Sequence, residues 1–496
     1  MRKSVNVSAS EVDGVQYRKA KTWQIALSQL NNGSAMVFFT LVGLMSYVGN
    51  EGYGIVMASI GVILTVTRVF DGLIDPFLAL MIDKVNTKFG KLRLFMSIGW
   101  VIRSIAMYML FIWGSGRGFG VVYFIILYSI YIVGSSIFDI AGNMIPSVMT
   151  NDPRQRPMIQ VWSTAYSYLI PTILTLVTTI VLLPRFGNQY TTEMLSSAAL
   201  IFIPVSLVMM LLCFVGVAEV DKPENFIGTA ATSDENNVSM RDMMVLFKRN
   251  KPFQMYIISS VAAKLGQQTA SQAIITTMLF GILIGNIQLG SIMGAISILP
   301  AIVFSIVGAK YSGKFGNRAT VITWTIISIA ISVISVIYLA MIDTRLISQS
   351  RGYMIVFFAL LILMNGAKMC VTVANGAMRS DVIDYELDIS GKFVPAVITA
   401  TYNFIDQFIT SLGSTIAAIG VSLVGYTTLA PQPNDELSSP IKWMTLFLYY
   451  GIPVLGWLVG LVAMKYYKLS KEEMVEVQRR IADKKEAILE QEGADS

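Results

Sequence analysis

Residues 54–82 read GIVMASIGVILTVTRVFDGLIDPFLALMI, an apolar run that is interrupted by Arg68, Asp71 and Asp75. At about 1.5 Å per helical residue, roughly twenty residues cross the ~30 Å hydrocarbon core of a bilayer. The three charged residues are spaced i, i+3 and i+7, so they share one face of a helix. Charges inside a span are costly and mark a pathway or a binding site. We therefore predict a membrane helix with a functional polar face.

The composition of the whole chain agrees with a membrane protein. Hydrophobic residues make up 54% of the 496 residues, charged residues make up 14%, and the mean hydropathy is +0.63. A soluble protein carries about 25% charged residues. This composition excludes a cytoplasmic enzyme, a secreted disulfide scaffold and a disordered chain. The net charge of +6 is read as loop charge, so we expect no nucleic-acid partner.

The rare residue types narrow the chemistry further. The chain has no histidine, which excludes imidazole metal sites, histidine-based triads and a histidine proton relay. Its two cysteines, Cys213 and Cys370, both lie in apolar runs, so no disulfide framework is expected. The first 24 residues are polar and charged, and no cleaved signal peptide is visible in them.

Twelve apolar windows are long enough to span a bilayer, which predicts an all-α membrane protein with twelve transmembrane helices. The windows cover residues 25–48, 54–82, 94–114, 120–149, 159–183, 195–218, 253–283, 288–309, 319–341, 353–378, 396–426 and 441–464. With the N-terminus inside the cell, 28 of the 37 lysines and arginines fall on the cytoplasmic side and 5 fall outside. Positive charge accumulates in cytoplasmic loops. We therefore predict that both termini are cytoplasmic and that the protein lies in the cell (inner) membrane.

The longest connection, residues 219–252, divides the spans into two sets of six. A cytoplasmic N-terminus (1–24) and a tail (465–496) flank an N-terminal bundle (25–218) and a C-terminal bundle (253–464). Lys88-Phe89-Gly90 follows span two and Lys314-Phe315-Gly316 follows span eight, which indicates a duplicated bundle. Residues 240–247 of the central loop have the pattern of an amphipathic helix. The tail opens on a capping box, Ser470 and Glu473, and is expected to be a solvated charged helix.

Eight acidic or basic residues lie well inside the predicted spans, and several of them share one depth. They are Arg68, Asp71, Asp75, Arg103, Asp139, Lys264, Lys368 and Asp406. Most lie about 9 to 11 residues from the cytoplasmic end of their span, which is roughly 15 Å and close to the bilayer midplane. Transporters place their binding sites at this level, with contributions from both halves. The alternative is that charges such as Arg103 and Asp406 only pair to lock helices together.

Two carboxylates one turn apart, Asp71 and Asp75, cannot both ionise cheaply in a low dielectric without a cation. They either share a proton or hold a hard cation through oxygen ligands. Pro76 removes one backbone N–H and frees the carbonyl of Gly72, a further possible ligand. A simple ion pair between Arg68 and Asp71 is the alternative, but it leaves Asp75 unexplained.

Several motifs together resemble the glycoside–pentoside–hexuronide:cation symporters, a family of the major facilitator superfamily. They are Arg68-Val-Phe-Asp71-Gly-Leu-Ile-Asp75-Pro76, Asp83, Thr87-Lys88-Phe89-Gly90-Lys91-Leu92-Arg93, Phe138-Asp139-Ile140, Thr150-Asn151-Asp152-Pro153-Arg154-Gln155-Arg156, Lys248-Arg249-Asn250-Lys251-Pro252, and Asp381-Val382-Ile383-Asp384-Tyr385-Glu386 with Gly391-Lys392. They follow one another in the family's order from residue 68 to residue 392.

This resemblance implies a twelve-helix major facilitator fold that couples uptake of a sugar to a monovalent cation. The family's cation site maps onto Asp71, Asp75 and Asp139, with the Ser136 hydroxyl one turn before Asp139. No cofactor is expected beyond the coupling ion, H+ or Na+. The expected partners are the sugar or glycoside, the cation and membrane lipid, and the protein is expected to work as a monomer.

The chain departs from the family pattern at positions that decide specificity. Ile74 stands where the family has an asparagine ligand, which favours protons over Na+ as the coupling ion. Asn143 replaces an aromatic sugar platform, Thr164 lies near an arginine position and Ser411 lies near a lysine position. The substrate contacts that we predict are Asn32, Arg68, Asn143, Lys264, Lys368 and Asp406. The two lysines favour an acidic sugar, or they hydrogen-bond hydroxyls of a neutral one.

Charged loop residues on the cytoplasmic side are expected to form a gate between the two halves. They are Asp83, Gly90, Lys91, Arg93, Arg156, Asp381, Asp384 and Glu386. Two other functions are considered. One is a major facilitator carrier of a lipid or another non-sugar solute. The other is an intramembrane lipid-modifying enzyme with a metal at Asp71, Asp75 and Asp83, and the twelve-span plan disfavours it.

Overall fold

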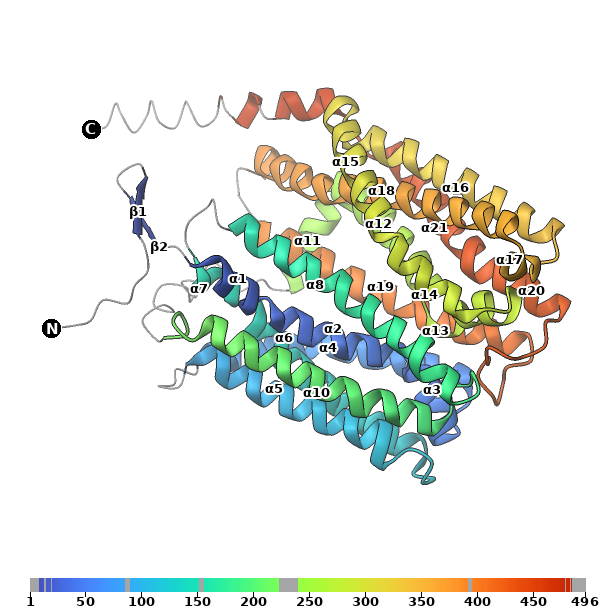
Figure 1. Ribbon diagram of the computed structural model, residues 1–496. Helices are drawn as coiled ribbons and strands as arrows, with labels where there is room; N and C mark the ends of the chain where they lie inside the picture. Colours follow the sequence, from blue (N-terminus) through green and yellow to red (C-terminus); the bar gives the residue numbers. More distant parts are fainter. Residues whose placement is uncertain are drawn as a thin grey trace, which may run out of the picture. The chain divides into compact units, whose positions relative to one another are not determined.

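The computed structural model describes residues 9–12, 15–18, 20–84, 90–150, 156–222, 240–390, 395–477, 479–481 and 483. Helices form nearly all of the described structure, which confirms the predicted all-α class (Figure 1). The exception is a short N-terminal hairpin of strands β1 (Ala9–Val12) and β2 (Val15–Arg18). These strands pair antiparallel, with Ala9 opposite Arg18 and Val12 opposite Val15.

The chain divides into two compact units. Unit 1 comprises residues 1–233, 290–295 and 418–436, and unit 2 comprises residues 234–289, 296–417 and 437–496. The main boundary lies within the predicted central loop. Two short segments from the second half of the chain therefore belong to unit 1.

The first half of the chain forms thirteen described helical segments, in which η marks π-helical turns. They are α1 (Thr22–Ser28), α2 (Leu30–Gly43), α3 (Met45–Tyr47), η1 (Val48–Gly52), α4 (Met57–Lys84), α5 (Lys91–Tyr108), η2 (Met109–Trp113), α6 (Gly120–Asn143), α7 (Ile145–Met149), α8 (Arg156–Leu176), η3 (Val177–Leu182), α9 (Leu183–Arg185) and α10 (Thr192–Val217).

The second half continues with a further set of helical segments. They are α11 (Met240–Arg249), α12 (Lys251–Ala270), α13 (Ala273–Thr276), η5 (Thr277–Leu283), α14 (Ile287–Ile296), α15 (Ile298–Phe315), α16 (Asn317–Met341), α17 (Leu346–Gln349), α18 (Arg351–Ser390), α19 (Pro395–Leu423), α20 (Ser439–Leu446), η6 (Phe447–Gly451) and α21 (Ile452–Tyr466). Helix α11 occupies the segment that the sequence predicts to be amphipathic.

The twelve predicted windows all contain helix. By length and composition, ten described helices could cross a membrane, or eleven if a bent pair counts as one span. That pair, residues 273–283 and 287–296, is bent by 117° and joins the predicted spans seven and eight. Helices α4 and α12, which carry several of the intramembrane charges, occupy the remaining windows. The predicted count of twelve is consistent with this arrangement.

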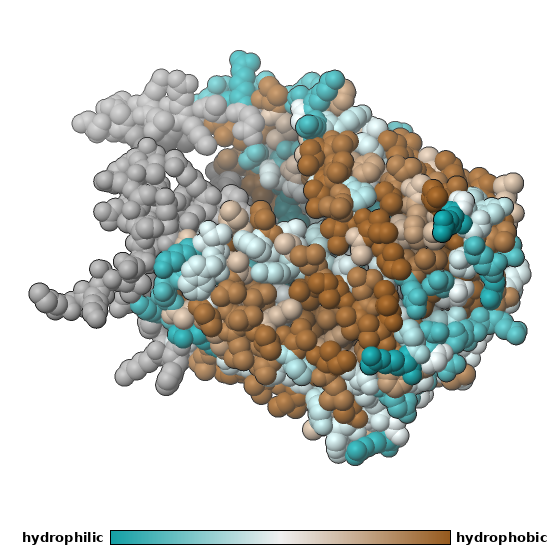
Figure 2. Space-filling model, in the orientation of Figure 1, coloured by the Kyte–Doolittle hydropathy of each residue, from teal (hydrophilic) through white to brown (hydrophobic). Residues whose placement is uncertain are grey.

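Large apolar side chains are exposed along single helix faces, as expected for surfaces that contact lipid. In α16, Ile326, Val333 and Ile337 are exposed, while Ser328 and Ser332 are buried on the other side of the helix. This reverses the pattern of a soluble protein. Figure 2 shows such apolar surface covering much of the helical region, with hydrophilic residues gathered toward its margins.

Close helix contacts position the polar residues of unit 1. Helices α5 and α6 cross at Gly99 and Gly134, where there is no room for side chains. A Cβ at Gly99 would lie 2.6 Å from the backbone N of Phe138, and one at Gly134 would lie 2.6 Å from the backbone N of Arg103. The two glycines thus bring Arg103 of α5 against the turn of α6 that precedes Asp139.

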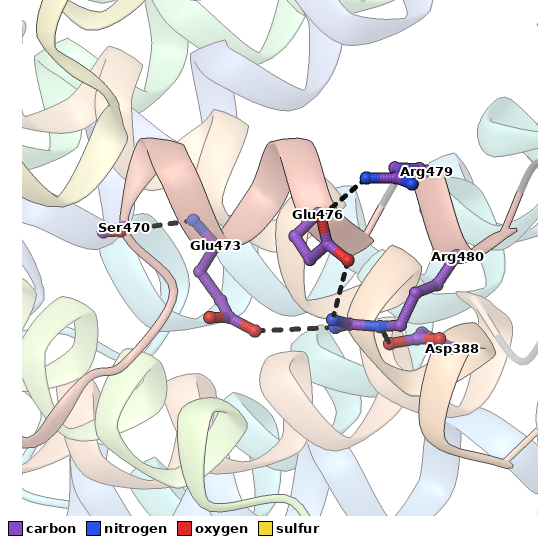
Figure 3. A network of polar contacts seen from close by, with 6 residues as sticks. All are labelled: Asp388, Ser470, Glu473, Glu476, Arg479 and Arg480. Atoms are coloured by element: carbon purple, nitrogen blue, oxygen red, sulfur yellow. Dashed lines mark hydrogen bonds and ion pairs between the residues drawn. The ribbon is translucent and has the colours of Figure 1, made fainter.

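The tail departs from the prediction of a solvated helix. Its capping bond is present, since Ser470 Oγ accepts from the backbone N of Glu473 at 3.3 Å. However, Val477 is fully buried and Ile481 nearly so. Arg480 Nε also donates to Asp388 Oδ2 of α18 at 2.8 Å (Figure 3). A few apolar residues within the charged tail dock it onto unit 2, so the prediction is wrong for this face.

Candidate functional site

Acidic and basic side chains from three helices of unit 1 line one cavity of about 150 Å³. The charged residues are Arg68 and Asp71 of α4, Arg103 of α5 and Asp139 of α6. Helix α2 supplies an apolar wall that includes Met36 and Phe39, and α6 adds Tyr128 and Tyr131. The spans that the sequence predicts to meet at the midplane therefore converge here.

The carboxylate of Asp71 in α4 is held by a hydroxyl group of the neighbouring helix α6. Ser136 Oγ donates to Asp71 Oδ1 at 2.6 Å, a short bond of the kind that carboxylates form with hydroxyl donors. The sequence places Ser136 beside Asp139, and the structure brings it to Asp71. Asp75 belongs to α4, but its side chain lies outside the described residues, as does that of Asp83.

A second cavity of unit 1, about 370 Å³, is lined mainly by amides and hydroxyls. Its polar residues are Gln29, Asn31, Asn32, Asp139, Asn143 and Ser163. Asn32 Nδ2 lies 2.8 Å from the backbone O of Ser163 and 2.7 Å from Ser167 Oγ. This amide links α2 to α8. The predicted contacts Asn32 and Asn143 thus line one cavity.

The position of the neighbouring Asn31 amide depends on a glycine of α6. A Cβ at Gly142 would lie 2.2 Å from Asn31 Nδ2, so any larger residue would displace the amide. Asn31 Oδ1 is buried and has no hydrogen-bond partner among the described residues. An unsatisfied buried acceptor costs free energy, and a hydroxyl donor of a ligand would remove that cost.

The two cavities adjoin at one carboxylate. Asp139 lines both of them, together with Ala35 and Met36 of α2. Its side chain is exposed to these spaces. A charge change at Asp139 therefore reaches the acidic cavity and the amide-lined cavity at the same time.

Unit 2 contains a polar cluster with different chemistry. Lys264 Nζ of α12 donates to Asp406 Oδ2 of α19 at 2.9 Å and lies 5.1 Å from the ring centroid of Tyr402. The guanidinium of Arg379 lies 4.2 Å from the same ring. Ser260 Oγ lies 2.9 Å from the Tyr402 hydroxyl oxygen. Lys264 and Asp406, two of the predicted substrate contacts, are thus paired with each other in this structure.

The second predicted lysine is held in another way. Lys368 Nζ of α18 lies 5.6 Å from the ring centroid of Trp457 of α21, a cation–π distance. No ion pair joins it to a carboxylate among the described residues. Of the two lysines predicted to contact substrate, Lys264 is neutralised by an acid, whereas Lys368 lies against an aromatic face and has no ion pair among the described residues.

The gate residues of the first half contact their own unit in this structure. Asp221 Oδ2 accepts from Arg93 Nε at 3.0 Å, and its two oxygens also accept from the backbone N–H groups of Leu92 and Arg93. Gly90 has φ +94°, and a Cβ there would lie 2.1 Å from Asp221 Oδ2. Lys91 is buried. The side chain of Arg156 lies outside the described residues.

The acidic gate residues of the second half are bonded within unit 2. Asp381 Oδ2 accepts from Asn317 Nδ2 at 2.7 Å. Glu386 is fully buried, pairs with Arg249 and accepts from Asn250 Nδ2 at 2.9 Å. Asp384 lies between these two residues on α18, three positions after Asp381 and two before Glu386. The gate remains a prediction, since the contacts described above join these side chains to residues of their own units.

Sequence reasoning missed several residues that complete these sites, such as Asp221, Tyr402 and Asn50. Asn50 Nδ2 donates to the backbone O of Ile55 and Thr428, and Asn50 Oδ1 accepts from the backbone N of Ala430. Nearby, burial raises the pKa of the Glu51 carboxyl, which a hydrogen bond from Gln432 partly opposes. For Asn50, the only sequence signal is an amide next to an acid, Asn50-Glu51, in the short connection between the predicted spans 25–48 and 54–82.

The fold and the adjoining polar cavities define a multi-pass membrane transporter rather than an enzyme. A family model described as "MFS/sugar transport protein" matches residues 31–471. Because this match covers most of the chain, the protein belongs to that family of the major facilitator superfamily. The family resemblance that the motifs indicate is confirmed.

Two relatives are similar to this chain at low identity. The isoprimeverose transporter of Lactiplantibacillus pentosus is 21% identical over 477 residues, 94% of this chain and 92% of that protein. The inner membrane symporter YicJ of Escherichia coli (strain K12) is 20% identical over 478 residues, 92% of this chain and 94% of that protein. Among solved structures, the nucleoside transporter NupG has a TM-score of 0.59 at 16% identity, covering 90% of this chain and 99% of that chain. That likeness shows the fold.

Proposed function

We propose that the protein is a cation-coupled symporter of a sugar, glycoside or hexuronide that works by alternating access of its two bundles. The relatives named as a sugar transporter and as a symporter support the substrate class and the coupling. The excess of lysine and arginine in one set of loops supports an inner-membrane protein with both termini in the cytoplasm.

The observation that carries this proposal is the position of Asp139 between the two cavities of unit 1. Besides Asp139, the amide-lined cavity offers uncharged donors and acceptors, which suit sugar hydroxyls. The acidic cavity offers carboxylates, which suit a proton or a metal cation. Binding of a cation near Asp139 would change the electrostatic potential in both cavities. The binding of the cation and that of the sugar would therefore be coupled through this one side chain.

A proton is the coupling ion that we favour over Na+. By analogy with other hard cations, Na+ needs five or six oxygen ligands. Ile74 supplies no side-chain oxygen at the family's asparagine position. A pair of carboxylates such as Asp71 and Asp75 needs only one proton to relieve its repulsion.

We also propose that the gate closes the cytoplasmic side during the cycle. In that state, basic loop residues such as Arg156 would pair with acidic residues such as Asp381. Single exposed ion pairs are weak, but several of them bias two states that differ by a few kcal/mol. Neutralising Arg156 or Asp381 is expected to favour the inward-open state. Unchanged labelling of a cysteine probe in the cytoplasmic cavity would contradict this.

Uptake into proteoliposomes tests the function. Purified protein is screened with neutral glycosides, pentosides and uronides under an imposed proton gradient, with Na+ or choline as the added cation. Accumulation should require the gradient and should be lost in Asp139→Asn. Asp343→Asn is the matched control, since Asp343 is an exposed acid in a loop. Transport of lipids or other non-sugar solutes, without any sugar uptake, would support the alternative carrier function.

A further inference from the structure

The connection between α19 and α20 belongs to a different unit from most of the chain around it. Residues 418–436 lie in unit 1, whereas most of α19 and all of α20 lie in unit 2. Residues 427–434, which we call the outer segment, form hydrogen bonds with the connections 49–53 and 184–194 of the first half. All three connections are predicted to lie outside the cell. The outer segment is thus covalently part of the second half but is bonded to the first.

One amide of the first half binds the outer segment as a neighbouring β-strand would. Asn50 Oδ1 accepts from the backbone N of Ala430 at 2.6 Å, and Asn50 Nδ2 donates to the backbone O of Thr428 at 2.7 Å. Asn50 Nδ2 also donates to the backbone O of Ile55 at 3.0 Å. Asn50 and Ala430 are 4% and 1% exposed. Losing this amide would therefore leave buried backbone groups without partners, which costs free energy.

A second amide, on the outer segment itself, bonds to both connections of the first half. Gln432 Oε1 accepts from the backbone N of Tyr190 at 2.9 Å, and Gln432 Nε2 donates to Glu51 Oε1 at 3.2 Å. The hydroxyl of the fully buried Tyr47 donates to the backbone O of Pro431 at 2.9 Å. The rings of Tyr47 and Tyr190 stack with 4.1 Å between their centroids. The outer segment is thus held by several directional bonds at one specific place.

The chain on either side of the outer segment leaves it little slack. On one side, the backbone N of Tyr426 donates to the backbone O of Val421 at 3.3 Å, at the end of α19. On the other side, the backbone N of Gln432 donates to Asp435 Oδ2 at 2.8 Å, and Ser438 caps α20. A fully extended residue spans at most about 3.6 Å, so these short flanks cannot absorb a large displacement. Movement of the ends of α19 and α20 away from unit 1 would therefore strain the bonds of the outer segment.

We propose that the outer segment is a latch that must leave Asn50 and Glu51 before the outer side of the transporter opens. This inference rests on the proposed alternating access, in which the two bundles separate on one side at a time. A docked latch favours the state that is closed on the outer side, because its hydrogen bonds are lost in the other state. The alternative is a passive tether that stays on unit 1 in both states, and its hydrogen bonds would favour neither state.

Spin-label distances in nanodiscs test the latch without any substrate. Labels on introduced ketone side chains at Lys222 in unit 1 and Lys310 in unit 2 report on the predicted cytoplasmic side, which closes when the outer side opens. Asn50→Ala should increase the population with the shorter distance about tenfold, as expected when two hydrogen bonds favour one state. The control Asn286→Ala should leave it unchanged. It removes an amide of another outer connection, whose Oδ1 accepts from the backbone N of Gln288 at 3.1 Å.

An exchange of side chains separates a latch from a general loss of packing. Gln432→Glu would place two carboxylates against each other at Glu51, so at mildly alkaline pH it should raise the short-distance population as Asn50→Ala does. Adding Glu51→Gln should reverse this effect, because one amide and one carboxylate would face each other again. Distances that stay as in the wild type in both Asn50→Ala and Gln432→Glu would overturn the proposal.

A reversible cross-link tests the opposite direction. Glu51→Cys with Gln432→Cys should release the latch. Joining the two thiols with a short bis-methanethiosulfonate reagent should remove the short-distance population, and a reductant should restore it. Ala340→Cys joined to Lys442→Cys is the control and should have no effect, since Lys442 Nζ lies 3.5 Å from the backbone O of Ala340 within unit 2. A short-distance population that survives the latch cross-link would show a passive tether. A protein that takes up no sugar would fail the uptake screen, while these distances would still decide the latch.

Discussion

The polar clusters of unit 1 and unit 2 are drawn from the same predicted depth, yet they differ in charge and in openness. In the cluster of unit 1, the described charged residues are two acids and two arginines, and Asp139 is exposed to two cavities. In unit 2, Asp406 is the acid of the cluster and is already bonded to Lys264, while Arg379 and Lys368 lie against aromatic rings.

We propose that this difference reflects different roles in transport. The carboxylates of unit 1 would bind the coupling cation next to its amide-lined cavity. The basic and aromatic side chains of the unit 2 cluster would add recognition of an anionic or ring-shaped solute. The predictions below compare matched changes in the two units.

The largest effect is expected from removing acids in unit 1. Asp75→Asn or Asp139→Asn should abolish accumulation against a gradient, while sugar binding or exchange can persist, because the coupling carboxylate is lost. Asp406→Asn in unit 2 should leave coupling intact and weaken binding. Proteoliposome uptake and counterflow distinguish these outcomes. If Asp75→Asn still accumulates substrate against a gradient, the assignment of coupling to the carboxylates of unit 1 is wrong.

A smaller, substrate-dependent effect is expected from the lysines of unit 2. We expect uronides to bind at least as well as neutral glycosides, because positive charge remains when Asp406 has neutralised Lys264. Lys368→Gln should lower uronide affinity by roughly tenfold, in the range of one charged hydrogen bond, and should affect neutral sugars less. Lys264→Gln should change the affinities for uronides and for neutral glycosides by more similar amounts.

Isothermal titration with matched neutral and acidic sugars measures this difference. Lys442→Gln is the control, since Lys442 lies at the outer end of the predicted span 441–464 and not near its middle. Binding of neutral glycosides alone, or equal losses for both sugar classes in Lys368→Gln, would remove the acidic-substrate hypothesis.

Each unit also has a buried carboxylate near its predicted cytoplasmic end. Asp221→Asn in unit 1 and Glu386→Gln in unit 2 should each lower the free energy of unfolding by about 2 kcal/mol, because both acids accept charge-assisted or backbone hydrogen bonds in buried positions. Denaturation in nanodiscs measures both. If only one of the two substitutions lowers the free energy of unfolding, the two buried carboxylates do not contribute equally to stability.

The smallest effect is expected for the docked tail of unit 2. Arg480→Gln should slightly loosen the tail, since it removes the contact with Asp388, and protease cleavage after residue 470 should become faster (Figure 3). Arg479→Gln is the control, because its contact with Glu476 spans 4.0 Å between largely exposed side chains. Equal cleavage of both variants would mean that the apolar contacts of Val477 and Ile481 alone hold the tail.

The sequence was sufficient to locate the helices because the length of an apolar span is a local property. The equal depth of Asp71, Arg103 and Asp139 along their spans agrees with their shared cavity. Lys264 and Asp406, which form an ion pair, also lie at one predicted depth. Depth along a helix can be read from residue numbers, since each residue advances the helix by a fixed rise.

Only the tertiary structure decided which partners these residues meet. Equal depth does not reveal that Ser136 bonds Asp71 rather than lying with Asp139, or that Asp139 faces two cavities. Nor does it show that Asn50 binds a segment almost 380 positions later in the chain. Those contacts depend on the rotation of each helix and on close crossings such as that of Gly99 and Gly134. Rotation and crossing are set by packing among several helices at once, whereas length, hydropathy and charge along one helix belong to the sequence itself.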